Sequence, residues 1–135
     1  MESLDELVDR VEEISRGDYR FAVGILVRCL KEIEESLPKE GLEALDISKA
    51  YWLNGEGTDG ELTRSRVACW KYLDNHGSST DLSRKEFRAM RALICTLHPE
   101  PPSEDLSELV EFFLQMCSDD GAVPRFVRDT IAVAQ

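Results

Sequence analysis

Apolar residues recur at steps of three and four along most of the chain, which is the period of an amphipathic α-helix and not of a β-strand. Prolines, glycines and polar residues separate these periodic stretches. The pattern predicts helices over residues 3–17, 18–36, 40–53, 58–75, 83–97 and 103–117, and a short last helix that begins at Pro124. Strand signals are scarce. We therefore expect an all-α fold, a single-domain irregular bundle of six or seven antiparallel helices across residues 1–135.

Side chains able to cap a helix stand at the predicted starts. Capping-box spacing occurs at Ser3 and Glu6, at Thr58 and Glu61, and at Ser83 and Glu86, while Asp18 and Ser103 can cap alone. The second helix carries the widest apolar stripe, which consists of Phe21, Ala22, Ile25, Leu26, Cys29, Leu30 and Ile33. Because Val23 and Val27 widen that stripe further, we expect this helix to be the central and most buried one.

Composition and net charge indicate which kinds of molecule this protein can bind. The chain has 135 residues, of which 42% are apolar and 32% charged, as in a soluble globular domain. Its net charge of −11 opposes binding to nucleic acid or to anionic lipid. The longest apolar run, residues 21–27, is far too short to span a membrane, and the acidic first 13 residues do not form a signal peptide. We expect a cytoplasmic protein with a neutral or basic protein partner, and no feature indicates an oligomeric state.

Residues typical of catalysis or of a metal site do not form a recognisable pattern. The four cysteines, Cys29, Cys69, Cys95 and Cys117, contain no C-x-x-C pair and stand among apolar neighbours, which predicts reduced thiols in the core. The two histidines, His76 and His98, fall at predicted helix ends, where they are expected to cap carbonyl groups. We predict no catalytic residue, no metal site and no cofactor.

A glycine-rich segment, residues 54–61, separates the third and fourth helices. Its alternating oxygen side chains and glycines suggest calcium, but the EF-hand positions for glycine and for the final acid hold Asp59 and Ser65. We interpret the segment as an interhelical turn, in which Asp59 and Glu61 complement the start of the next helix.

Charge is distributed unevenly along the chain. Residues 1–58 have a net charge of −7, residues 59–98 of +2 and residues 99–135 of −6. Arg84, Arg88 and Arg91 share one face of the fifth helix, and we expect them to pair with the acidic helices of the same chain, with anion binding as the alternative.

The sixth helix carries a line of acids. Glu104, Glu108 and Glu111 are spaced to share one face, Asp105 extends it, and Asp119 and Asp120 follow. The line is either a solvated surface or the contact for a basic partner. Clustered carboxylates would accelerate association with such a partner.

Aromatic residues flank the glycine-rich turn. Trp52 and Tyr51 are adjacent, about 100° apart around the third helix, so one of them is expected to be partly exposed. Trp52 and Trp70 are therefore either core residues or interface anchors.

Part of the chain resembles a known class of protein. The matching stretches are residues 44–56, ALDISKAYWLNGE, residues 62–70, LTRSRVACW, and residues 87–95, FRAMRALIC. Over residues 40–98 they resemble the small all-α immunity proteins of bacterial polymorphic toxin systems, in which a helix ending in a Trp and a Gly-Glu turn precedes a helix with an early Arg. The resemblance implies a cytoplasmic protein that binds and neutralises a toxin.

The function expected from these observations is therefore stoichiometric inhibition of a basic toxin domain. The candidate contact residues are Glu104, Asp105, Glu108, Glu111, Asp119, Asp120, Trp52, Glu56 and Asp59. A generic helical adaptor or scaffold, bound through an apolar groove, is the alternative. An enzyme comes third, because it would require a cleft with His76 or His98 beside a carboxylate.

Overall fold

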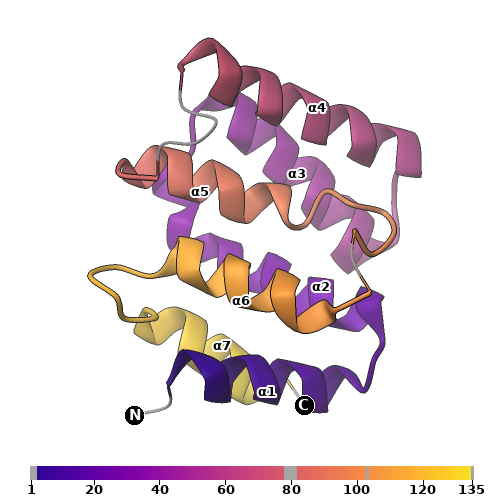
Figure 1. Ribbon diagram of the computed structural model, residues 1–135. Helices are drawn as coiled ribbons and strands as arrows, with labels where there is room; N and C mark the ends of the chain where they lie inside the picture. The colour runs from indigo at the N-terminus through magenta and orange to yellow at the C-terminus, as the bar shows by residue number, and fades with distance from the viewer. Residues whose placement is uncertain (1–2, 78–81, 103, 135) are drawn as a thin grey trace.

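The computed structural model describes residues 3–77, 82–102 and 104–134 (Figure 1). These residues form seven α-helices and one 3-10 helix: α1 (Leu4–Ser15), α2 (Tyr19–Cys29), η1 (Leu30–Ser36), α3 (Lys39–Asn54), α4 (Asp59–Asn75), α5 (Lys85–Ile94), α6 (Leu106–Cys117) and α7 (Arg125–Val133). Between the described residues no strand forms, and one isolated bridge joins Asp119 to Ala122. The predicted all-α bundle of six or seven helices is confirmed.

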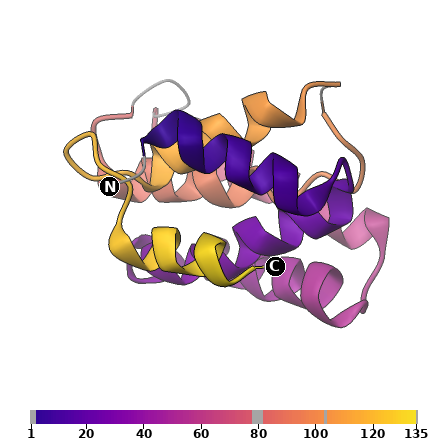
Figure 2. The same ribbon diagram turned by 90° about the horizontal axis from the view of Figure 1, so that it is seen from below.

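The helices pack in two layers (Figures 1 and 2). One layer holds α1, α6 and α5 side by side, and the other holds α7, α2 with η1, and α3. The remaining helix, α4, packs against α3 and α5 at one end of the bundle. Both described ends of the chain lie at the opposite end of the bundle, where α1 contacts α7.

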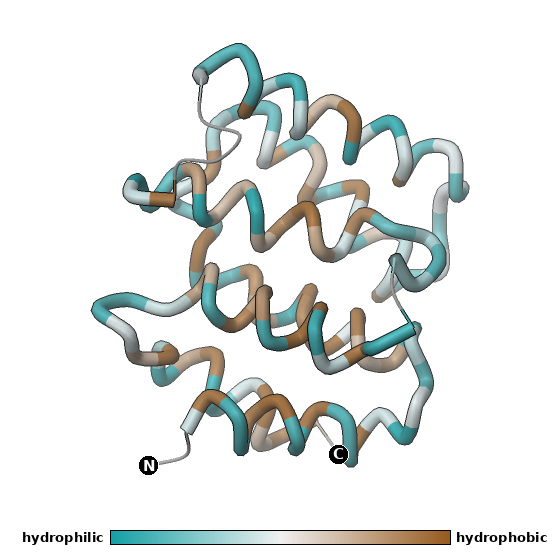
Figure 3. Tube along the Cα trace, viewed as in Figure 1, coloured by the Kyte–Doolittle hydropathy of each residue, from teal (hydrophilic) through white to brown (hydrophobic). Residues whose placement is uncertain are grey.

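Apolar side chains from all seven helices meet in one core between the layers. Hydrophobic and hydrophilic positions alternate along each helix, as Figure 3 shows. The largest side chains that are fully buried include Phe113, Leu7, Ile25, Leu26, Leu30, Leu45, Leu62, Leu73, Met90, Leu93, Leu97 and Leu114. Six consecutive residues of α2, residues 22–27, are buried, because α2 contacts α1, α3, α6 and α7. The predicted central position of this helix is confirmed.

Most predicted helix starts are correct. Ser3 and Glu6 form the capping box, Asp18 Oδ1 accepts from Phe21 N at 3.2 Å, and Thr58 Oγ1 accepts from Glu61 N at 3.1 Å. Ser103 lies outside the described residues, and the N-cap of α6 is Asp105, which accepts from Ser107 N at 3.0 Å.

Two local predictions are wrong. The capping box expected at Ser83 does not form, since α5 begins at Lys85 with Arg84 at the N-cap and no capping side chain. The carboxylate of Glu86 instead accepts from the Tyr72 hydroxyl and pairs with Arg84 at 3.2 Å. The second helix also does not remain α-helical to residue 36: after Cys29 the i→i+3 bonds of η1 tighten its last turns before Pro38.

The cysteines are part of this core. All four are free and buried, as predicted. Burial raises the pKa of Cys29, Cys69 and Cys95 to about 12, and it also raises the pKa of Cys117 well above its ordinary value. Since the thiolate is the nucleophilic form, these thiols act as small apolar side chains.

Within the described ranges, no helix has both the length and the apolar character needed to cross a lipid bilayer.

Candidate functional site

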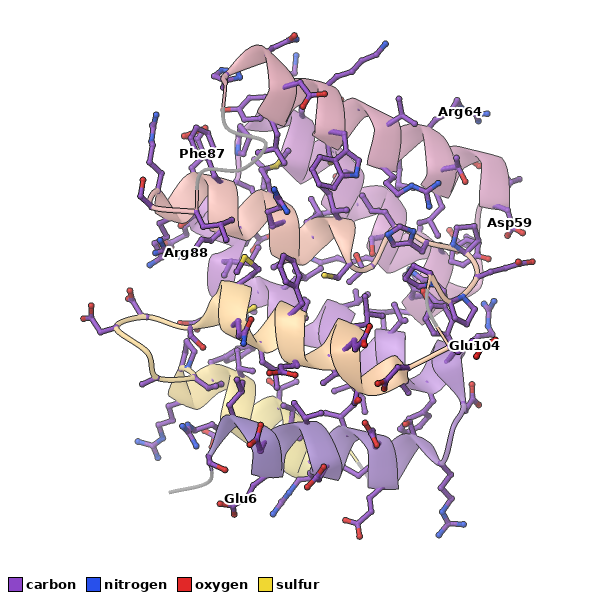
Figure 4. All side chains as sticks on the ribbon, viewed as in Figure 1. Glu6, Asp59, Arg64, Phe87, Arg88 and Glu104 are labelled. Atoms are coloured by element: carbon purple, nitrogen blue, oxygen red, sulfur yellow. The ribbon has the colours of Figure 1, made fainter. Side chains whose placement is uncertain are left out.

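One surface of α6 carries a line of carboxylates, which we call the acidic face: Glu104, Glu108, Glu111, Asp119 and Asp120. All five side chains are exposed. The opposite side of α6 buries Val110, Phe113 and Leu114 in the core, so packing fixes which side of the helix points to solvent. Glu104 stands where the chain enters α6 (Figure 4), and the two aspartates lie in the turn after its other end.

Among the described residues, the acidic face has no neutralising partner. Across residues 3–77, 82–102 and 104–134, no ion pair joins any of its five carboxylates to a Lys or Arg side chain. The Glu111 carboxylate accepts one long hydrogen bond, 3.5 Å, from Gln115 Nε2. Asp105 differs from these five residues, because its carboxylate is occupied as the N-cap. The hydrogen bond from the Ser107 hydroxyl lowers the pKa of Asp105.

Acidic residues on the neighbouring helix extend this charge. Asp5, Asp9 and Glu12 of α1 recur at the same spacing as the three glutamates of the acidic face, and α1 packs along α6. Asp5 and Asp9 are exposed and Glu12 is half-buried. Two adjacent helices of one layer therefore present carboxylates.

The arginines of α5 do not pair with the acidic helices, so that expectation is wrong. Arg84 pairs with Glu86 of its own helix and lies 4.8 Å from the centre of the Phe87 ring. Arg88 Nη1 donates to the backbone oxygens of Leu82 at 2.9 Å and Ser83 at 3.1 Å.

The third arginine of α5 turns toward α4. The guanidinium of Arg91 lies over the Trp70 ring, 4.8 Å from its centre. The three guanidinium groups thus reach Glu86, the backbone just before α5, and the Trp70 ring on α4, and no described ion pair joins them to the acidic face.

Trp52 and Asp59 have structural partners at one end of the bundle. Trp52 Nε1 donates to the backbone oxygen of Thr96 at 2.6 Å, which ties α3 to the end of α5. Asp59 Oδ1 accepts from the Tyr51 hydroxyl at 2.6 Å, and this hydrogen bond raises the pKa of Tyr51. As predicted for this pair, Tyr51 is buried and Trp52 is half-buried.

The nine candidate residues therefore do not form a single site. The exposed Glu56 stands with Trp52 and Asp59 around the turn between α3 and α4. This group belongs to the turn between α3 and α4 and not to the acidic face, although Figure 4 shows Asp59 and Glu104 on the same side of the view. The five residues of the acidic face follow one another along α6 and the segments just before and after it.

The two histidines interact with polar groups other than carboxylates. His76 stacks on Tyr72, with ring centres 4.0 Å apart, and its Nδ1 lies 2.8 Å from the Tyr72 backbone oxygen. His98 Nδ1 lies 2.7 Å from Arg66 Nη1. Because a guanidinium can only donate, Nδ1 of His98 is the acceptor and the neutral ring carries its proton on Nε2.

His98 connects three elements at the start of the proline-rich segment. Its backbone oxygen accepts from the Tyr19 hydroxyl of α2 at 2.9 Å, and Arg66 of α4 also donates to the Leu97 oxygen at 3.4 Å. Burial of the ring, and then the charge of Arg66, lower the pKa of His98 from its ordinary value of 6.5.

The lowered pKa of His98 makes stability dependent on pH. As the pH falls, the unfolded chain binds a proton at His98 before the folded chain does. The contribution of His98 to the free energy of unfolding is therefore complete above pH 6.5, and it is lost as the pH falls through the lowered pKa of the folded state. We expect the free energy of unfolding, measured with urea, to decrease between pH 7 and pH 5. His98→Asn keeps an acceptor for Arg66 without a titrating ring, and it should lessen this decrease. An identical pH dependence in the variant would contradict the assignment.

Sequence reasoning missed two surface features. A cleft of about 840 Å³ lies beside the turn after α6, and its walls include Arg88, Gln115, Asp120 and Arg128. The other is an apolar groove between α2 and α7. Gly24, a glycine inside a strongly helical stretch, lies on the same side of α2 as Phe21 and Arg28 of this groove.

Comparison with known proteins provides no further constraint. No protein-family model, no curated protein and no solved structure matches this chain.

Proposed function

We propose that this protein is a cytoplasmic immunity protein that binds a cognate bacterial toxin and neutralises it by stoichiometric binding, with the acidic face as the contact. The observation that supports the proposal is the exposed line of Glu104, Glu108 and Glu111, which lacks a cationic partner in the described chain although Arg84, Arg88 and Arg91 lie on the adjacent helix. The partial resemblance to immunity proteins over residues 40–98 agrees with this function.

The physical mechanism is electrostatic complementarity. Toxin domains that act on nucleic acid or phosphate compounds carry basic active sites, and carboxylates on a rigid helix attract such a surface over about 8 Å at physiological salt. The helix can then cover the site and exclude its substrate. Inhibition of this kind depends on affinity alone and needs no chemistry from the inhibitor.

The test is capture of the partner from the source cells. The tagged full chain is purified at about 0.15 M salt, and bound proteins are identified by mass spectrometry. We expect one stoichiometric basic partner that kills cells when expressed alone and is harmless when co-expressed with this chain. A partner that is harmless by itself, or the absence of any partner, would overturn the proposal in favour of a helical adaptor.

A further inference from the structure

An apolar groove lies between α2 and α7, in the layer opposite to the acidic face (Figure 2). Its volume is about 550 Å³, and its walls are Phe21, Arg28, Phe126, Thr130, Val133 and Ala134. The exposed fractions of Phe21, Phe126 and Val133 are 43%, 38% and 81%. Phe21 was expected in the core stripe of α2, so its exposure is a correction: α2 is apolar on nearly every side, and α7 leaves this side uncovered.

The buried Gly24 leaves open space on the side of α2 that carries Phe21 and Arg28. Gly24 follows Phe21 by three residues and precedes Arg28 by four, so it lies on the same side of α2 between them. A Cβ built on Gly24 would meet nothing within 4 Å. Alanine there would therefore fit and would favour the helix. Glycine at this position keeps the surface of α2 low between Phe21 and Arg28, which suits close approach by another backbone.

The charge along the groove is positive. Arg28 is exposed, and no hydrogen bond or ion pair of the described residues engages its guanidinium. On α7, Arg125 and Asp129 pair with each other at 3.6 Å, and the Thr130 hydroxyl donates to the Phe126 backbone oxygen at 2.7 Å. Arg28 is thus the charged group in the wall that can pair with an occupant, and a carboxylate is its complement.

The size of the groove favours a short helical segment over a second copy of the chain. The segment from Phe21 to Arg28 spans about 10 Å, or two turns of a helix. The exposed apolar side chains of the groove offer roughly 300 Å² of surface. A stable interface buries more, roughly 800 Å² per partner. Two copies with a charge of −11 each would also repel one another.

We propose that the α2–α7 groove binds an amphipathic helix of another protein, whose apolar side chains sit between Phe21 and Phe126 over Gly24 and whose carboxylate pairs with Arg28. This surface is independent of the toxin contact proposed for the acidic face, because the two lie in different layers.

The test uses a defined peptide probe. A phage-displayed library of 16-residue helical peptides, with apolar residues at positions i, i+3, i+4 and i+7 and either Glu, Gln or Lys at one flanking position, is selected against the full chain. The affinity of the recovered peptides is then measured by fluorescence anisotropy. We expect the recovered peptides to carry Glu, and we expect Gly24→Leu or Phe126→Ser to weaken their binding at least tenfold.

Two matched variants make the result specific. Val67→Ser removes an apolar side chain of similar exposure, 47%, from α4 and should leave the affinity unchanged. Arg28→Glu should reverse the preference from the Glu peptide to its Lys counterpart. If Gly24→Leu does not fold, Gly24→Ala replaces it, because alanine stabilises the helix. This variant shows whether a smaller side chain at position 24 already lowers the affinity for the peptide.

Three results would overturn the proposal. They are a library that yields no binder, binding that survives both Gly24→Leu and Phe126→Ser, and a dimer in sedimentation that Phe126→Ser abolishes. The last result would assign the groove to a second copy of the chain. Lysine substitutions in the acidic face should leave peptide binding intact, which separates this test from that of the toxin partner.

Discussion

Replacing Glu104, Glu108 and Glu111 together by lysine is expected to lower the affinity for the proposed toxin partner at least 100-fold. The substitutions place like charges against a basic surface, which costs several kcal/mol and slows association. The same change should abolish protection of cells that express the toxin. Because the three side chains are exposed and lack ion pairs in the described chain, the midpoint of urea unfolding should change little.

A control variant separates local contact from net charge. Lysine at Glu35, Asp46 and Asp74 raises the net charge by the same amount, and these three residues are exposed on η1, α3 and α4. We expect this variant to bind and to protect as the unmodified chain does. Equal losses in the two variants would mean that overall charge, and not the acidic face, determines affinity.

Substituting Phe113 by alanine should destabilise the fold by about 3–5 kcal/mol, because it leaves a cavity where a fully buried ring packs between the two layers. Native domains are stable by only about 5–15 kcal/mol, so this variant should unfold at much lower urea. The slope of the transition should stay the same if only stability changes.

The neighbouring Phe112 provides the comparison for this substitution. Its ring is half-buried at the edge of the core, and Phe112→Ala should cost about 1–2 kcal/mol. Similar losses at the two positions would show that α6 does not face the core as described.

Helix positions were predictable because local signals determine them. The spacing of Leu7, Val8 and Val11 gives both the period and the buried side of α1, and Ser3 with Glu6 gives its start. The start of α5 was not predictable in this way, because Glu86 is engaged by Tyr72, which lies 14 residues earlier in the sequence and on another helix. An N-cap can be predicted from neighbouring residues only when no side chain distant in the sequence forms hydrogen bonds with the same capping atoms.

The candidate site was predictable only in part for the same reason. Periodicity places Glu108 and Glu111 on one side of α6, but it does not fix Glu104, which precedes the extended N-cap Asp105, nor does it reveal whether Arg88 of α5 would reach these carboxylates. The groove was missed because Phe21 looks like a core residue when seven consecutive residues of α2 are small or apolar. Whether such a residue is covered depends on how α7 crosses α2, which no local pattern encodes.

The packing of α1 also determines when the protein can complete its fold on the ribosome. Its buried residues Leu7, Val8 and Val11 rest against α6, which is separated from α1 by about ninety residues of chain. At a synthesis rate of about 5–20 residues per second, α6 is made roughly 5–20 s after α1. During that interval the apolar stripe of α1 has no partner from α6, so the layer of α1, α6 and α5 can close only late in synthesis.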